Sequence, residues 1–101
     1  MDWDFFFRQL EAGVNVGEIC FYFADDPDET ERYLGYMPTQ DRPYWIGACD
    51  IQDGCNFSDA SALVNASVFD GKSLRDRWDN VVLCSIEACS PEWWMESFYH
   101  I

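Results

Sequence analysis

The sequence predicts a single α+β domain over residues 1–101, with a mainly antiparallel sheet of four or five strands and three or four short helices. Three observations lead to this prediction. Apolar residues near the N-terminus follow a helical period, several later runs are apolar or alternate as strands do, and short connections join those runs. With 49% hydrophobic and 18% aromatic residues, the 101-residue chain has enough apolar side chains for one core.

The first element expected is a helix at the N-terminus. Its apolar residues recur at i, i+3, i+4 and i+7, which places them on one face: Trp3, Phe6, Phe7 and Leu10. Asp2 can accept a hydrogen bond from the first turn, and Gly13 can end the helix because glycine readily adopts the left-handed conformation. We therefore expect the helix to lie between Asp2 and Gly13.

Two strands are expected next, on either side of an acidic stretch. Residues 18–23, EICFYF, predict the first strand. After Glu18, both of the alternating sets of residues are apolar or aromatic, which indicates a strand covered on both faces. The following stretch contains Pro27 and breaks the strand. Residues 31–37, ERYLGYM, then predict the second strand.

A helix over residues 28–36 is the alternative for this second element. Asp28 could cap it, whereas Gly35 would weaken it. The proline-flanked loop of residues 38–43 leads to YWIGACDI, residues 44–51, which predicts a third strand. Short connections of this kind favour an antiparallel meander.

The second half of the chain begins with another helix signal. Ser58 is expected to cap a helix over residues 59–66, with Phe57 just outside as a hydrophobic staple. Residues 67–72, SVFDGK, predict a short strand and a turn.

Three further elements follow towards the C-terminus. Ser73 and Asp76 resemble a capping box for a short helix over residues 74–78. Residues 81–88, VVLCSIEA, predict a strand because they begin with β-branched residues and alternate later. Residues 90–92, Ser-Pro-Glu, are a helix start, with a cap, a proline in the first turn and an acid near the positive end of the helix dipole.

The charge of the chain favours a basic partner. Six basic and 19 acidic residues give a formal net charge of −13, against about 2–8 in magnitude for a typical small domain. Such a charge repels nucleic acid and anionic membranes, so we expect neither as a direct partner. No apolar stretch approaches the roughly 20 residues of a membrane-spanning helix, and no export signal is visible, so we expect a cytoplasmic protein.

Catalytic and metal-binding chemistry finds little support in the sequence. The single histidine, His100, is next to last, and neither a catalytic triad nor a phosphate-binding glycine loop can be assembled. The five cysteines contain no CxxC pair: Cys20, Cys49, Cys55, Cys84 and Cys89. We therefore expect no enzyme activity, no cofactor and no metal, and we expect free thiols, with Cys20 and Cys84 as small core residues of strands.

The stretch ADDPDETE, residues 24–31, is the clearest candidate for binding; we call it the acidic loop. It holds five carboxylates in eight positions, and they cannot all be buried: Asp25, Asp26, Asp28, Glu29 and Glu31. Nearby aromatic and acidic residues complete the candidate set: Tyr33, Tyr36, Asp41, Asp50 and Asp53. Tyrosines commonly anchor interfaces, and a rim of carboxylates would steer a cationic partner.

Part of the chain resembles a known class of bacterial proteins. The stretches are PYWIGACDI, FSDASALVNASVFDGKSLRDRWDNVVLCSIE and SPEWW, with a spacing centred on Phe57, Ala60, Leu63, Ala66, FDGKSL and Trp78. They resemble the small immunity proteins encoded beside contact-dependent growth inhibition toxins and similar polymorphic toxins. The resemblance covers roughly residues 42–96, so the acidic loop lies outside it.

This resemblance implies an inhibitor that binds one toxin domain, one to one, in the cytoplasm. Many such toxins are nucleases with basic clefts, which an acidic protein could occlude by placing carboxylates where phosphates would lie. The alternatives are an acidic nucleic-acid mimic of the antirestriction type, and a small hydrolase with a carboxylate pair.

Overall fold

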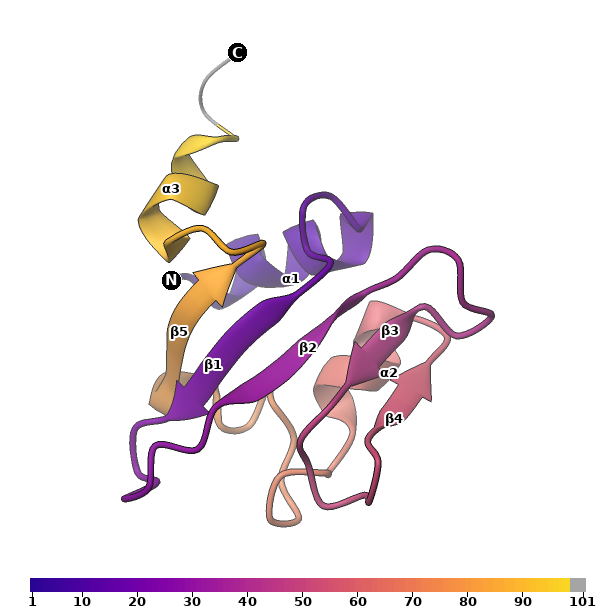
Figure 1. The fold of residues 1–101 in the computed structure, drawn as a ribbon, viewed down its shortest axis with the longest axis vertical. Helices are drawn as coiled ribbons and strands as arrows, with labels where there is room; N and C mark the ends of the chain where they lie inside the picture. Colours follow the sequence, from indigo (N-terminus) through magenta and orange to yellow (C-terminus); the bar gives the residue numbers. More distant parts are fainter. Residues whose placement is uncertain (99–101) are drawn as a thin grey trace.

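The computed structural model describes residues 1–98, so His100 lies outside the described residues (Figure 1). Its elements, in chain order, are α1 (Trp3–Ala12), β1 (Ile19–Phe23), β2 (Arg32–Tyr36), β3 (Tyr44–Ile46), β4 (Cys55–Phe57), α2 (Ala60–Asn65), the 3₁₀ turn η1 (Trp78–Asn80), β5 (Val81–Ile86) and α3 (Pro91–Glu96). The predicted α+β class is confirmed, with five strands and three α-helices in the described part of the chain.

The strands form one antiparallel sheet in the order β4-β3-β2-β1-β5. Strands β1 to β3 form the predicted antiparallel meander, β4 extends it by one strand, and β5 returns to pair with the free side of β1. The register between β1 and β5 shifts after Cys20, where Cys20 faces Ser85 and Phe21 faces Leu83. Strands β4 and β5 are therefore the two edges of the sheet.

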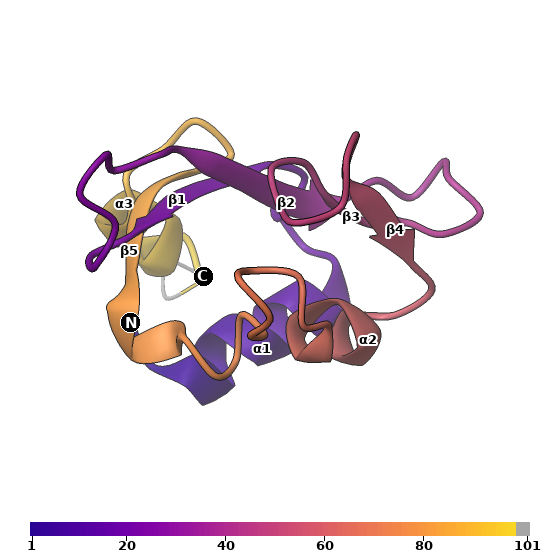
Figure 2. The same cartoon turned by 90° about the horizontal axis from the view of Figure 1, so that it is seen from below.

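Helices α1 and α2 cover one face of the sheet, as Figure 2 shows from below. The core lies between these layers, and its largest fully buried side chains come from both: Phe6, Leu10, Ile19, Phe21, Phe23, Leu34, Leu63, Phe69, Leu74 and Ile86. No described helix lies on the opposite face of β1, where Cys20 is buried and Tyr22 is half-buried. The expectation that this strand is covered on both faces therefore holds at Cys20 and only in part at Tyr22.

The local signals at the helix starts are largely confirmed. The Asp2 carboxylate accepts the N–H of Phe5 at 3.1 Å, and Gly13 ends α1 with a φ of 70°. Ser90 caps α3 by accepting the N–H of Trp93 at 3.2 Å. Helix α2, however, is capped by Asp59 and not by Ser58: the Asp59 carboxylate accepts the N–H of Ala62 at 2.7 Å.

Several predicted elements are shorter than expected or absent. The alternative helix over residues 28–36 is wrong, because residues 32–36 form β2. Strand β3 covers only residues 44–46 of the predicted 44–51. The chain bends after it and returns as β4, which the sequence did not predict.

The segment between α2 and β5 is mostly turns. Residues 67–72 contain only an isolated bridge between Phe69 and Lys72, not a strand. The Ser73 hydroxyl does accept the N–H of Asp76 at 3.0 Å, but turns and the η1 segment follow in place of the predicted helix over residues 74–78. This segment packs below the sheet, where Phe69 meets Phe21 and Phe23 with ring centroids 5.9 and 5.4 Å apart.

Candidate partner-binding surface

The acidic loop lies at one end of the sheet, together with the β3–β4 connection. Strand β1 ends at residue 23 and β2 begins at residue 32, while β3 ends at residue 46 and β4 begins at residue 55. Because neighbouring strands are antiparallel, these two connections share one end, and the β2–β3 connection lies at the other (Figure 1).

Asp26 organises the acidic loop from within. Its carboxylate accepts the backbone N–H of Asp28 at 3.0 Å and that of Thr30 at 3.1 Å. These two donors, Asp28 first, hold the pKa of the Asp26 carboxyl below its ordinary value of 3.8. Glu29 adopts a left-handed φ of 47°, and its N–H donates to the Asp26 carbonyl at 3.1 Å. Asp26 is therefore an internal support of the loop.

Arg77 anchors the base of the loop. Its Nη2 lies 2.7 Å from Oδ1 of Asp25, and its Nη1 lies 3.7 Å from Oδ2 of Asp70. The guanidinium also lies over the ring of Phe23, 3.6 Å from the centroid. The side chain of Arg77 is only 12% exposed, whereas that of Asp25 is 55% exposed. The charge of the loop is thus partly compensated by an arginine 52 residues away in the chain.

Arg32 lies beside Arg77 under the same loop. Its Nη1 donates to the carbonyl of Ala48 at 3.2 Å, and its guanidinium lies 5.5 Å from the ring centroid of Phe23. Its Nε is buried without a hydrogen-bond partner. Both arginines line a hollow of about 340 Å³, and residues 25–27 and Thr30 of the acidic loop line it too.

Asp50 joins this surface from the β3–β4 connection. Its two carboxylate oxygens accept the N–H groups of Asp70 and Gly71, each at 3.0 Å. These bonds hold the pKa of Asp50 below 3.8, and they place Asp70 beside Arg77. Asp70 was not among the residues predicted from the sequence, because only the fold brings its turn to the acidic loop.

The tip of the loop presents the carboxylates that remain available. The side chains of Asp28 and Glu29 are exposed. Among the described residues, they accept no hydrogen bond and form no ion pair. Glu31 accepts the phenol O–H of Tyr33 at 3.1 Å, a bond that raises the pKa of Tyr33 to about 12. Tyr33 therefore lies at the edge of the same surface.

Of the other predicted residues, two lie apart from the acidic loop and one lies at its end of the sheet. Tyr36 packs against the core, with its ring 4.9 Å from that of Tyr44, because it lies on the same face of β2 as the buried Leu34. Asp41 lies in the β2–β3 connection at the opposite end of the sheet. Asp53 lies in the β3–β4 connection at the near end, exposed in a turn with a φ of 68°.

The cysteines do not form a metal site in the described part of the chain. No group of three or more histidine, cysteine or acidic side chains there is placed to hold a metal ion. All five cysteines are free, and Cys84 is exposed on β5, so its predicted place in the core is wrong. Within residues 1–98, no helix has the length and apolar character needed to cross a bilayer.

Comparison with known proteins finds no matching family model, no matching curated protein and no matching solved structure.

Proposed function

We propose that this chain is an immunity protein that binds and neutralises a cognate bacterial toxin domain, one to one, in the cytoplasm. The partner we propose is a basic nuclease domain, whose active-site or substrate cleft the acidic loop occludes. In this proposal the chain has no enzymatic activity and needs no cofactor.

The observation that carries the proposal is that some carboxylates of the acidic loop hold its conformation, whereas others are exposed without partners. Asp25 and Asp26 are engaged in holding the loop, through Arg77 and through two backbone N–H groups. Asp28 and Glu29 project at the tip without partners among the described residues. A loop held in shape before binding loses less conformational entropy when a partner docks.

The position of these carboxylates suits a cleft that binds phosphates. Acidic side chains at the tip can pair with the lysines and arginines that would otherwise contact a nucleic-acid backbone. A net charge of −13 would also speed the encounter with a basic surface. Both effects support an inhibitor in preference to an enzyme.

The experiment that tests this proposal uses the toxin domain encoded next to the gene for this chain. We expect co-production of the chain to abolish the toxicity and the nuclease activity of that domain. We also expect light scattering after size-exclusion chromatography to give a one-to-one complex. Undiminished toxin activity in a molar excess of folded chain would contradict the proposal.

A further inference from the structure

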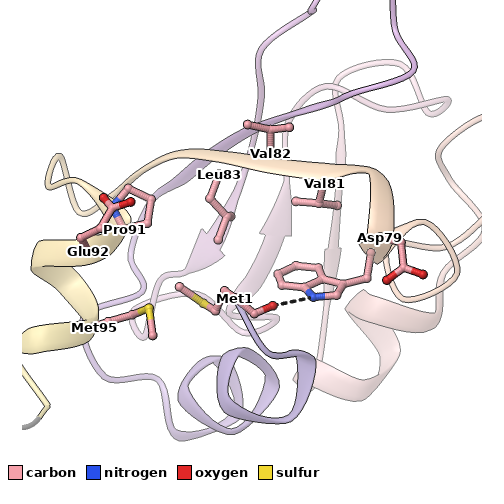
Figure 3. A pocket seen from close by; sticks show the side chains of 9 residues that line it. Met1, Asp79, Val81, Val82, Leu83, Pro91, Glu92 and Met95 are labelled. Atoms are coloured by element: carbon pink, nitrogen blue, oxygen red, sulfur yellow. Dashed lines mark hydrogen bonds between the residues drawn. The ribbon is translucent and has the colours of Figure 1, made fainter.

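A second hollow lies beside the edge strand β5, away from the tip of the acidic loop. It has a volume of about 470 Å³ and is open to solvent. Figure 3 shows Val81 and Leu83 of β5 pointing into it, opposite Met95 of α3. Trp78 and Met1 also line it, and the Nε1 of Trp78 donates to the carbonyl of Met1 at 3.1 Å. We call this hollow the β5 groove.

The backbone of β5 is available along the groove. The sheet ends at β5, which pairs only with β1 among the described strands. The Asn80 carbonyl accepts the N–H of Ala24 at 2.6 Å, so Asn80 directs its backbone towards β1. Backbone groups alternate in direction along a strand, so Val82 also faces β1, whereas the N–H and C=O of Leu83 face the free edge.

The first half of β5 lacks most of the features that usually prevent an edge strand from pairing with another chain. Natural edges carry lysines, prolines, inward charges or bulges that prevent pairing with another chain. Residues 81–86 of β5, VVLCSI, contain neither a charge nor a proline, and the register shift begins only beyond Leu83. The first half of β5 can therefore accept a further strand.

The charges at the β5 groove favour a basic strand over an acidic one. The charged side chains that line it among the described residues are Asp79 at one end and Glu92 at the other, and both are exposed. A second copy of this chain would bring two more carboxylates to the same place and add its own charge of −13. A strand with apolar side chains between lysines or arginines would complement both the groove and its ends.

We propose that the β5 groove binds an extended, basic segment of a partner protein by strand addition to β5. The segment pairs with the backbone of Leu83, inserts alternate apolar side chains between Val81, Leu83 and Met95, and places cationic residues beside Asp79 and Glu92. This inference does not rest on the proposed function, because it concerns a different surface and can be tested without a toxin.

The test uses a synthetic peptide of the six-residue length of β5, alternating valine and threonine between terminal lysines. We expect its addition at millimolar concentration to the full chain to shift the amide resonances of residues 81–84 and the indole resonance of Trp78. A second peptide, N-methylated at alternate residues, cannot pair with a strand edge and should leave these resonances unchanged.

A pair of matched variants separates groove charge from net charge. Asp79→Asn with Glu92→Gln should weaken binding of the lysine-flanked peptide about tenfold, because two surface pairs are lost. Asp41→Asn with Asp53→Asn changes the net charge equally and should leave the affinity unchanged. Equal binding of the N-methylated peptide, equal weakening by both variants, or shifts at the acidic loop without shifts at β5 would each overturn the proposal.

Discussion

Arg77 should contribute more to stability than any other basic residue near the acidic loop. Its side chain lies 3.6 Å from the ring centroid of Phe23 and 2.7 Å from the Asp25 carboxylate, and it is 12% exposed. A largely desolvated cation over an aromatic ring contributes up to about 2 kcal/mol. The ion pair adds at most about 0.5 kcal/mol, because Asp25 is 55% exposed. Packing of the aliphatic stem contributes about 1 kcal/mol more.

We therefore expect Arg77→Ala to lower the free energy of unfolding by about 3 kcal/mol. Arg77→Lys keeps the charge but loses the planar stacking, so about 1 kcal/mol should be lost. The matched control is Arg75→Ala: the Arg75 side chain is exposed, and the change should cost less than about 0.5 kcal/mol.

Urea denaturation followed by tryptophan fluorescence measures these differences. For a domain of this size, a loss of about 3 kcal/mol corresponds to a fall in Tm of roughly 10–20 °C. A double-mutant cycle with Asp25→Asn should assign no more than about 0.5 kcal/mol to the ion pair itself. If Arg77→Ala is as stable as Arg75→Ala, Arg77 does not anchor the loop.

Three further predictions follow from single residues. Gly35→Ala should prevent folding or destabilise the domain severely, because a Cβ there would lie 2.1 Å from the Gly17 carbonyl oxygen. Thermal unfolding followed by circular dichroism measures this effect, and a near-normal Tm of the variant would contradict the prediction. In an ultraviolet titration, Tyr33 should ionise near pH 12, and Glu31→Ala should move its pKa towards 10.0. A titration curve that Glu31→Ala leaves unchanged would show that the hydrogen bond to Glu31 does not raise this pKa. The lowered pKa of Asp26 stabilises the folded state above the ordinary value of 3.8, and this contribution is lost as the pH falls through the folded pKa. Asp26→Asn should therefore lose less stability than the native chain between pH 5 and acid pH, and parallel curves of unfolding free energy would contradict this.

The elements that the sequence predicted correctly are those with local causes. The α1 boundaries follow from Asp2 and Gly13, which form hydrogen bonds only with residues in the adjacent turn of the helix. Ser90 and the proline after it define the start of α3 in the same way. The error at α2 is also local: Ser58 and Asp59 are both good caps, and the pattern could not choose between neighbours.

The features that the sequence did not predict depend on distant parts of the chain. Strand β4 has only three residues, with Asn56 at its centre, and it is a strand because β3 pairs with it. Gly35 was weighed only as a helix breaker, yet its role is to let the Gly17 backbone cross β2.

The acidic loop itself was predicted, but the roles of its carboxylates were not. Nothing in the spacing of Asp25 and Arg77, 52 residues apart, indicates that they form an ion pair. Asp70 reaches this surface only because Asp50 holds its turn. A pattern of acids can indicate a charged surface, whereas the division into anchored and available carboxylates depends on tertiary hydrogen bonds.

The measurement that tests the central claim most directly is the rate of association with the cognate toxin domain at several salt concentrations. Asp28→Asn with Glu29→Gln removes the two available tip charges. Asp41→Asn with Glu11→Gln is the control with the same change in net charge: Asp41 lies at the opposite end of the sheet, and the exposed Glu11 lies near the end of α1, where its carbonyl contacts Tyr44 at the start of β3. We expect the tip variant to associate about tenfold more slowly at low salt and with a flatter salt dependence, because only charges within about 8 Å of the contact steer it at physiological salt. The control should behave as the native chain. Association and dissociation rates of the tip variant that match those of the native chain at every salt concentration would show that the acidic loop is not the interface.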